Sequence, residues 1–312
     1  MTFKLGLVGL CTSHPENWVP AIRTLKAEGK VDAEVVAVWD SGETRPAGFA
    51  RDFASKFGVP RSVERLEEML ELVDGVIVHT ANWDSHVEQA RPFVEAGKAA
   101  LLDKPIAGNL KDIAQILDWL KQGKRICGGS SLRFCAEVGD YLRLPVEERG
   151  EPHLAFSSIG VDDFNYGIHG YALLSCLMGP GVKPVRYLGS TRQKQFRLAW
   201  ADGRAALLNA GQSAWLPFNL TVTTTKQVKQ LEADGGKIYY NFLAAALPYL
   251  TGAVEEPPLR AEAWVEPELA ALAARMSWLN HGQEVFLSDL RMDDPGFDGT
   301  AFAQEYRRAR LG

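Results

Sequence analysis

The chain has 312 residues, of which 46% are hydrophobic and 23% are charged, as in a soluble globular protein. This length suffices for two domains with separate cores. The net charge of −5 argues against nucleic acid or an anionic membrane as a partner, because no basic excess is present to neutralise phosphates.

The four cysteines show neither metal-ligand spacing nor the density of a disulfide-rich protein. We therefore expect Cys11, Cys127, Cys135 and Cys176 to be reduced thiols in a cytoplasmic protein without a metal cluster. The apolar run at residues 5–10 is short for a signal peptide and lacks a cleavage site, so we interpret it as a first strand. No apolar run approaches the length needed to span a membrane.

The first 130 residues alternate apolar, β-like runs with helical patterns. Strands that are apolar throughout and separated by helices indicate a parallel sheet covered on both faces. This pattern predicts a Rossmann-type dinucleotide-binding domain over residues 1–130. The expected strands are Lys4–Gly9, Ala33–Trp39, Gly75–His79, Ala99–Asp103 and Arg125–Gly128.

Residues 131–312 have a different character. A helix is expected from about Phe164 to Met178, and the longer β-like segments after it are separated by turn signals. The pattern predicts a substrate and oligomerisation domain of the α+β class, built on a mainly antiparallel open sheet with helices on one face. Two further helices are expected near Tyr239–Thr251 and Pro267–Leu279, the second with a proline in its first turn. The expected strands are Val185–Gln195, Phe196–Trp200, Arg204–Ala210, Leu220–Thr225 and Val228–Ala233.

The run Asp103-Lys104-Pro105 ends one of the expected parallel strands. In open α/β sheets, ligands bind beyond the carboxyl ends of the strands, so Lys104 should face the place where a cofactor lies. A lysine is a mobile cation with a tunable pKa, which suits it to hold or deprotonate a hydroxyl group. The alternative is a surface lysine at a strand-to-loop junction.

The expected dinucleotide turn departs from the G-x-G-x-x-G pattern. Residues 9–14 read Gly-Leu-Cys-Thr-Ser-His, so only Gly9 matches. Cys11 adds a Cβ where the backbone should approach the pyrophosphate, and His14 stands where glycine allows tight packing of helix on strand. As a motif, this turn is weak evidence for dinucleotide binding.

Two interpretations remain open for the polar residues of this turn. The hydroxyl groups of Thr12 and Ser13 could replace the lost backbone contacts to a cofactor. Alternatively, Ser13 and Glu16 form a capping box before the first helix. The charge of Glu16 would then compete with a phosphate for the amides of the helix start.

Asp40 ends the second expected strand, where an acidic residue accepts the ribose hydroxyls of NAD and repels the 2′-phosphate of NADP. The spacing from Gly9 is longer than usual, and the alternative is an aspartate of a strand-end turn. Arg45 lies nearby in the sequence and could accommodate a phosphate. We therefore expect NAD as cofactor and leave NADP possible.

The segment that opens the second domain's first helix carries polar groups at helical spacing. Asn165 and His169 are i and i+4, and Tyr166 and His169 are i and i+3, so the three would share a helix face. Histidine is the side chain that most readily exchanges a proton near neutral pH. The alternative is a buried, hydrogen-bonded histidine at a domain interface.

The order of these features resembles the glucose–fructose oxidoreductase / inositol dehydrogenase / MocA (Gfo/Idh/MocA) family over nearly the whole chain. An acidic-Lys-Pro motif and a Gly-x-His helix are specific together, although neither is specific alone. Further matches are Thr80 and His86 after the third expected strand and Arg133 at the domain junction. The chain is a variant of the pattern, because Asp103 replaces the commoner glutamate and the glycine turn is degenerate.

The resemblance implies which residues form the site. In that family the motif lysine and the histidine flank the nicotinamide, with an aspartate four residues before the histidine; these positions are Lys104, His169 and Asn165 here. Asn165 can bond a substrate hydroxyl but cannot supply charge to make His169 more basic. Asp162 or Asp163 could partly replace that charge. The implied catalytic residues are Lys104, His169, Asn165 and Tyr166; the cofactor residues are Gly9, Cys11, Thr12, Ser13, His14, Asp40, Thr80, His86, Asp103 and Lys104; the substrate residues are Arg133, Asp162 and Asp163.

The function that we expect is NAD(P)-dependent hydride transfer between a nicotinamide cofactor and a sugar, polyol or related hydroxyl compound. One alternative is a lyase or glycosidase that uses transient oxidation without net redox change. A second is a redox-silent ligand-binding protein on the same scaffold, which the asparagine and the degenerate turn favour. A third is a structural protein. The resemblance also implies a homo-oligomer paired through the sheet of the second domain.

Overall fold

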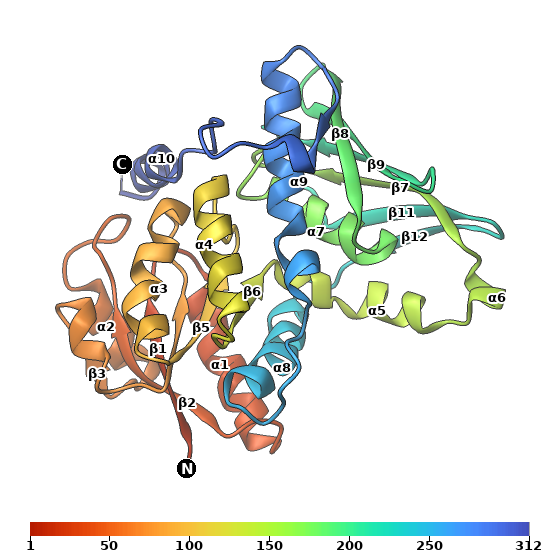
Figure 1. Ribbon diagram of the computed structural model, residues 1–312. Helices are drawn as coiled ribbons and strands as arrows, with labels where there is room; N and C mark the ends of the chain where they lie inside the picture. Colours follow the sequence, from red (N-terminus) through yellow and green to blue (C-terminus); the bar gives the residue numbers. More distant parts are fainter. Residues whose placement is uncertain (312) are drawn as a thin grey trace.

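The computed structural model describes residues 1–311, which form two β-sheets with helices packed on and between them (Figure 1). The first sheet is wholly parallel, with the strand order β3-β2-β1-β4-β5-β6. It includes one short strand, β3, that the sequence pattern missed. The strands are β1 Phe3–Val8, β2 Ala33–Trp39, β3 Arg61–Ser62, β4 Gly75–Val78, β5 Ala99–Asp103 and β6 Ile126–Gly129.

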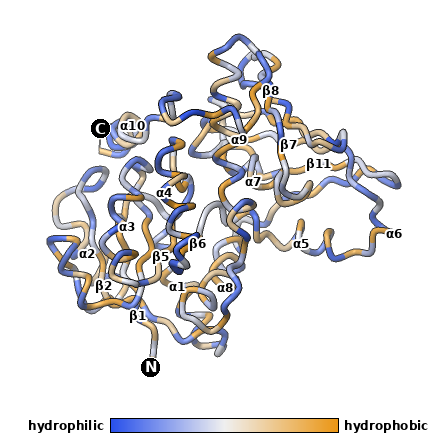
Figure 2. Tube along the Cα trace, viewed as in Figure 1, coloured by the Kyte–Doolittle hydropathy of each residue, from blue (hydrophilic) through white to orange (hydrophobic). Residues whose placement is uncertain are grey.

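Both faces of the first sheet are covered, as its uninterrupted apolar strands require. The residues of β4 and β5 are all buried, and Figure 2 shows the strands of this sheet as largely hydrophobic. Alternate residues enter different cores, because Ile77 packs on one side of the sheet while Val76 and Val78 pack on the other. The helices within this part of the chain are α1 His14–Ala27, α2 Phe49–Phe57, α3 His86–Glu95 and α4 Leu110–Lys121.

The second sheet has seven strands in the order β12-β11-β7-β10-β9-β8-β13. All its pairs are antiparallel except β7 with β10, so the predicted α/β plus α+β architecture is confirmed with one parallel pair added. Helix α7 and one side of α9 fill its core. The strands are β7 Pro152–Ile159, β8 Val182–Ser190, β9 Lys194–Trp200, β10 Ala205–Ala210, β11 Asn219–Thr224, β12 Val228–Glu232 and β13 Val285–Phe286; the helices are α5 Ala136–Arg143, α6 Val146–Arg149, α7 Gly167–Met178, α8 Ile238–Leu250, α9 Ala261–Leu279 and α10 Gly299–Leu311.

Three helices from the second half of the chain return to the first sheet. Helix α8 packs on α1, where the ring of Phe242 lies 5.4 Å from that of Trp18 and 5.2 Å from that of Phe134. Helix α9 places Trp264 and Leu272 against the first sheet and the alanines of its other side against the second. The division at residue 130 therefore describes the two sheets, while the core of the first domain also contains later segments.

Helix α10 lies across the ends of the first sheet towards which its strands run (Figure 1). The carboxylate of Asp84, which follows β4, accepts the backbone N–H of Gly299 at 2.8 Å and of Thr300 at 3.2 Å. This acidic side chain stabilises the positive end of the helix dipole. At the other end of α10, Arg307 donates to the carbonyl oxygens of Gly42 and Glu43, both at 3.0 Å.

Several expected element boundaries are wrong, each for a local reason. Helix α7 begins at Gly167 and not near Phe164, because the Asp162 carboxylate takes up the N–H groups of Phe164 and Tyr166 in a turn before the helix. Helix α9 begins at Ala261, so Pro267 lies inside it; the residues before this proline have good helix propensity and bury Trp264. The expected strand Val185–Gln195 is divided between β8 and β9 by a turn.

The cysteines and the helices give two further findings. Cys11, Cys127, Cys135 and Cys176 are all free thiols. No helix within residues 1–311 combines the length and the apolar character that crossing a bilayer requires.

Replacing Phe242 by alanine should destabilise the protein by about 3–5 kcal/mol, because the ring is fully buried between α1 and the junction of the domains. Urea unfolding monitored by tryptophan fluorescence measures the change. The control Val228→Ala alters a residue that is 66% exposed and should change stability by less than about 0.5 kcal/mol. Equal effects of the two substitutions would contradict the assignment of α8 to this core.

Candidate active site

The carboxyl ends of β4, β5 and β6 bring together the polar side chains of the candidate site. Asp103 is central, because one carboxylate oxygen accepts the N–H of Lys104 at 2.7 Å and the other binds Nδ1 of His14 at 2.5 Å. The carboxylate is 3% exposed. Burial opposes its charge, but the charge and hydrogen bond of His14 outweigh burial and hold the pKa of Asp103 well below its usual range. Asp103 is therefore an anion that links the degenerate turn to the lysine motif.

Lys104 connects the two domains. Its Nζ donates to the backbone oxygen and to Oδ1 of Asn165, both at 3.0 Å, and lies 5.3 Å from the centre of the Tyr166 ring. Burial lowers the pKa of this amine, while Asp103 and Asp162 act in the opposite direction. A lysine with a lowered pKa exchanges protons more readily at neutral pH than an exposed one.

His169 lies in the first turn of α7 and is 5% exposed. Its Nδ1 bonds the hydroxyl of Ser130, which follows β6, at 2.7 Å. Burial, and then the positive charge of Lys104, lower the pKa of His169 well below the usual value. The imidazole is therefore neutral at pH 7, and Ser130 leaves Nε2 for another partner.

Asn165 and Tyr166 precede the helix, so the helix-face argument that grouped them with His169 is wrong, although the turn still brings Asn165 and Tyr166 to Lys104. Asp162 holds that turn, accepting the N–H of Tyr166 at 2.8 Å and lying 3.4 Å from Nδ2 of Asn165. Burial raises the pKa of Asp162 despite these hydrogen bonds. The amide of Asn165 thus lies between the Asp162 carboxylate and the lysine.

Asp163 borders the same cavity as Asp162 and Asn165. Its carboxylate forms an ion pair with Lys194 of β9, which itself lies 3.8 Å from the ring centre of Trp278. The charged groups that shift the pKa of His169 are Lys104, His14 and Asp103, and they include neither Asp162 nor Asp163. The suggestion that one of these carboxylates replaces the missing charge at His169 has no support in the geometry.

The turn after β1 is built around Gly9, which has φ +81°. A Cβ at Gly9 would lie 2.8 Å from the backbone nitrogen of Thr80 and 2.9 Å from its Cα, so only glycine allows β1 and β4 to approach here. Cys11 is fully buried, and burial, with a smaller contribution from Asp40, raises its thiol pKa to about 11. Cys11 therefore packs as a small apolar side chain.

The expected capping box of the first helix does not form. Ser13 makes no side-chain hydrogen bond to the helix start, and the Thr12 hydroxyl accepts the N–H of His14 at 3.1 Å. The carboxylate of Glu16 turns to the guanidinium of Arg45, at 3.8 Å. The competition between Glu16 and a phosphate for these amides is thus absent from the structure.

Asp40 joins the end of β2 to this turn, accepting the N–H of Leu10 at 2.6 Å and of Gly42 at 2.8 Å. Beside it, at the carboxyl ends of β2 and β3, lies a cavity of about 300 Å³, at the lower end of the range of small-molecule sites. Its lining includes Asp40, Ser41, Gly42, Phe49, Ser62 and Glu64.

The two predicted cofactor residues after β4 have structural partners. His86 is fully buried and its Nε2 bonds the backbone oxygen of Thr80 at 2.7 Å. The hydroxyl of Thr80 in turn bonds Gln89 at 2.5 Å. These bonds hold the loop after β4 in place. His86 therefore contributes to the site by positioning that loop.

Arg133 lies near α9 and is half-buried. Its Nε and Nη1 are buried and have no hydrogen-bond partner within residues 1–311. Burial lowers its pKa, and the groups that oppose this effect are Cys176, Glu268 and Glu266. Its role in substrate binding stays a prediction.

The sequence reasoning missed several residues of the site. His79, the residue after β4, is 1% exposed, packs 4.8 Å from the ring centre of Trp18 and has no partner for either ring nitrogen within residues 1–311. Burial lowers its pKa to about 3. Its position at a strand end was a usable signal, since the same reasoning selected Asp40 and Lys104. Ser130 directly follows β6 and so carried the same strand-end signal.

Glu268 of α9 fixes the turn that follows the lysine motif. Its Oε1 accepts the N–H of Ile106 at 3.2 Å, and the side chain is almost completely buried. Burial raises the pKa of this carboxyl to about 8. Nothing in the sequence pattern indicated that Glu268 would reach this turn from more than 160 residues away.

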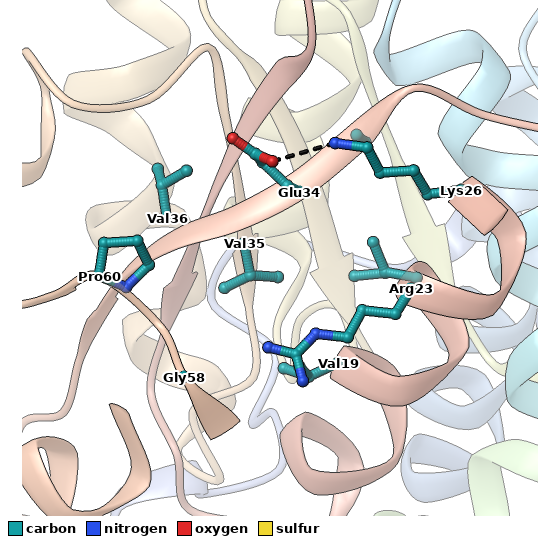
Figure 3. Close-up of a pocket in the computed structure, with 10 residues that line it drawn as sticks. Val19, Arg23, Lys26, Glu34, Val35, Val36, Gly58 and Pro60 are labelled. Carbon is teal, nitrogen blue, oxygen red and sulfur yellow. Dashed lines mark hydrogen bonds and ion pairs between the residues drawn. The ribbon is translucent and has the colours of Figure 1, made fainter. Parts of the chain in front are cut away.

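Two cavities differ in their relation to the cluster. One, of about 290 Å³, is bordered by Asn165, Asp162 and residues of α10, and so lies beside the lysine's partners. The other, of about 240 Å³, lies between α1 and β2, where Arg23 and Lys26 border it and Lys26 pairs with Glu34 (Figure 3). Figure 3 contains none of the site residues, so only the first cavity is a candidate substrate site.

The described part of the chain contains no group of three or more His, Cys, Asp or Glu side chains placed to hold a metal ion. The strand order 3-2-1-4-5-6, with a second domain closing on the carboxyl edge, defines a Rossmann-type fold. Residues 3–129 match the family model of the GFO/IDH/MocA "oxidoreductase family, NAD-binding Rossmann fold". The similarity to this family thus covers the first domain of the chain.

Curated relatives align over part of their length. The chain is 34% identical over 113 residues to trans-1,2-dihydrobenzene-1,2-diol dehydrogenase of Danio rerio, covering 35% of this chain and 31% of that protein. It is 34% identical over 116 residues to 1,5-anhydro-D-fructose reductase of Ensifer adhaerens, covering 36% and 32%. The match thus spans about a third of each relative.

Solved structures share the fold over both domains. Scyllo-inositol dehydrogenase from Lactobacillus casei, with bound NAD(H) and scyllo-inositol, superposes with a TM-score of 0.73 at 16% identity, covering 92% of this chain and 100% of that chain. Myo-inositol 2-dehydrogenase from Lactobacillus plantarum gives a TM-score of 0.76 at 12% identity, covering 92% and 99%. At these identities the likeness concerns the fold.

Replacing Glu268 by glutamine should stabilise the protein increasingly as the pH rises from 5 to 8. The folded state keeps the Glu268 proton up to about pH 8, whereas the unfolded chain loses it near pH 4.5, so the wild type loses stability across this interval. Glutamine cannot ionise, and its Oε1 still accepts from Ile106. Melting temperatures measured at both pH values test this difference.

The matched control is Glu262→Gln, which changes an exposed carboxylate on the same helix. Its melting temperature should follow that of the wild type at both pH values. Parallel pH dependences for Glu268→Gln and the wild type would show that the Glu268 carboxyl is not held protonated.

Proposed function

We propose that this protein is an NAD-dependent oxidoreductase that acts on the carbinol group of a sugar, polyol or related hydroxyl compound. The observation that carries the proposal is the buried amine of Lys104 at the carboxyl end of β5, held by Asn165 of the second domain and close enough to His169 to lower its pKa. A cation and a neutral base at the edge where dinucleotides bind are what alcohol oxidation requires.

The residues at this edge fit a dinucleotide. Gly9 leaves no room for a Cβ where β1 meets β4, and the cavity beside Asp40 can take the adenosine end. NAD, when bound, accepts a hydride from the carbinol carbon of the substrate. The chain has to hold the substrate hydroxyl, receive its proton and stabilise the charge that develops on its oxygen.

The residues of the site can perform each of these tasks. Lys104 donates a hydrogen bond to the substrate hydroxyl and stabilises the developing alkoxide. His169 accepts the hydroxyl proton on Nε2, with its ring oriented by Ser130. Asn165 and Tyr166, which lie against the lysine, hold neighbouring substrate hydroxyls.

The charges near the turn support NAD over NADP. Asp40 places a carboxylate at the end of β2, where the 2′-phosphate of NADP would lie. Arg45 points away from that position, because it donates to the carbonyl oxygens of Leu10 at 2.9 Å and Thr12 at 3.2 Å.

The proposed substrate is a small, hydroxyl-rich molecule. The cavity beside Asn165 is bordered by Asp162, Gln212 and Arg275, which can bond several hydroxyl groups. The relatives are named for a cyclic diol and an anhydro-sugar, and the similar structures for inositols. These names favour a cyclic polyol or sugar.

A redox-silent binding protein is the second candidate. Asn165 supplies no negative charge to His169, and the buried side chains of Cys11 and His14 fill the turn that normally approaches a cofactor. Titration of the protein with NADH and NADPH, followed by tryptophan fluorescence and calorimetry, decides between the candidates. Full recovery of NAD after product formation would instead favour the lyase or glycosidase alternative.

Pairing of two copies through the second sheet stays a prediction. Leu154 of β7 and Leu188 of β8 are 39% and 48% exposed, which supports a sheet face open to a partner. Sedimentation as a monomer at micromolar concentration would count against pairing. A cytoplasmic location likewise stays a prediction, supported by the free thiols.

Replacing Lys104 by methionine should lower kcat/KM by roughly 10²–10⁴-fold, because the group that stabilises the alkoxide is removed. The fold should persist, since a long apolar side chain fits a site where burial already disfavours the charge. Steady-state rates and circular dichroism give the two measurements. The control is Lys111→Met, which removes an equal charge from an exposed site on α4. Near-normal rates in Lys104→Met would contradict the mechanism.

The pH profile reports on His169. Because its pKa lies well below 6.5, the imidazole stays unprotonated in mildly acidic solution, so the acid limb of kcat/KM for oxidation should lie well below pH 6.5. In His169→Gln this limb should disappear while the overall rate falls. An acid limb near pH 6.5 that survives the substitution would assign the base to another residue.

A further inference from the structure

Helix α10 crosses the proposed cofactor site. Figure 1 shows it over the ends of the first sheet, and its contacts reach the loops after β1, β2 and β4. Among these contacts, Arg310 donates to the carbonyl oxygen of Cys11. The last turns of the described chain therefore lie on the degenerate turn itself.

Two guanidinium groups meet at that turn. Arg45 donates to the carbonyl oxygens of Leu10 and Thr12, and Arg310 donates to the carbonyl between them, that of Cys11. Three consecutive carbonyls thus anchor two cations. The two arginines are close enough that Arg310 adds to the effect of burial in lowering the pKa of Arg45.

Each guanidinium group also lies against an aromatic ring. Arg45 lies 4.2 Å from the ring centre of Phe49, and Arg310 lies 4.9 Å from that of Tyr306. A guanidinium has five N–H donors, and the carbonyl bonds use two on Arg45 and one on Arg310. Several donors on each therefore stay available in a fixed orientation.

The two guanidinium groups differ in their acidic neighbours. Arg45 lies 3.8 Å from a carboxylate oxygen of Glu16, and Asp40 accepts the N–H of Leu10 in the same turn. Arg310 has no ion pair within residues 1–311. Two neighbouring guanidinium groups with unused, oriented donors are suited to bind a phosphate.

We propose that Arg45 and Arg310 bind the pyrophosphate of the dinucleotide, so that helix α10 completes the cofactor site where the glycine turn is degenerate. The inference rests on the proposed function and adds Arg310 of helix α10 to the residues of the cofactor site. Planar guanidinium groups bind phosphate oxygens through paired hydrogen bonds. They supply the contacts that backbone amides make at a glycine-rich turn, where Cys11 and His14 now stand.

The test measures binding rather than turnover. The dissociation constants of NADH and ADP-ribose are determined by calorimetry for the wild type, Arg310→Gln, Arg310→Lys and Arg45→Gln, with adenosine as the probe that lacks a pyrophosphate. Arg308→Gln is the matched control, because Arg308 is an exposed residue of the same helix.

Both glutamine variants should bind NADH and ADP-ribose roughly 10- to 100-fold more weakly, as for lost hydrogen bonds to a charged group. Adenosine affinity should be unchanged, Arg310→Lys should be intermediate, and the loss should shrink as salt rises. Arg308→Gln should match the wild type.

Two results overturn the inference in distinguishable ways. If the wild type binds NADH and ADP-ribose, and Arg310→Gln binds them equally well or more tightly, the inference alone is overturned. Tighter binding by the variant would show that α10 obstructs the cofactor. A wild type that binds neither probe overturns the proposed function, and the inference with it.

Discussion

The candidate site depends on one buried carboxylate. Asp103 binds the imidazole of His14 from the first helix and the backbone of Lys104 from its own strand end. A charge buried this deeply is tolerated only when it is paired and hydrogen-bonded, so the positions of all three residues are coupled. This contact gives His14 a structural role at the position where the glycine pattern has a glycine, because its imidazole binds the Asp103 carboxylate there.

Around this pair, the second half of the chain closes the site. Helix α9 brings Glu268 to the backbone of Ile106, just after the motif, and the turn before α7 brings Asn165 to the lysine. Helix α8 packs on α1, and Arg310 of α10 binds the turn that follows β1. The lysine therefore sits between two domains whose relative placement is maintained by several independent contacts, and this placement excludes water from the amine and lowers its pKa.

The parallel sheet and the strand-end positions could be predicted because both follow from local pattern. Uninterrupted apolar runs between helices produced the strands, and strand ends led to Asp40, Asp103 and Lys104. The same rule would have led to His79, which no motif drew attention to. The predicted helix starts were wrong where side chains determine them. The turn held by Asp162 moves the start of α7 to Gly167. Pro267 lies inside α9, because the residues before it favour an earlier start.

The sequence by itself determined the fold class, the edge of the sheet at which chemistry can occur and the residue types available there, because these depend on periodicity and on chain order. The tertiary structure decided which groups meet. Asp163 pairs with Lys194, Arg133 lies near α9, and Arg310 reaches a turn almost 300 residues earlier. Such contacts depend on how separate elements pack, and no local spacing encodes them. The arginines on the degenerate turn are a feature of the packed molecule.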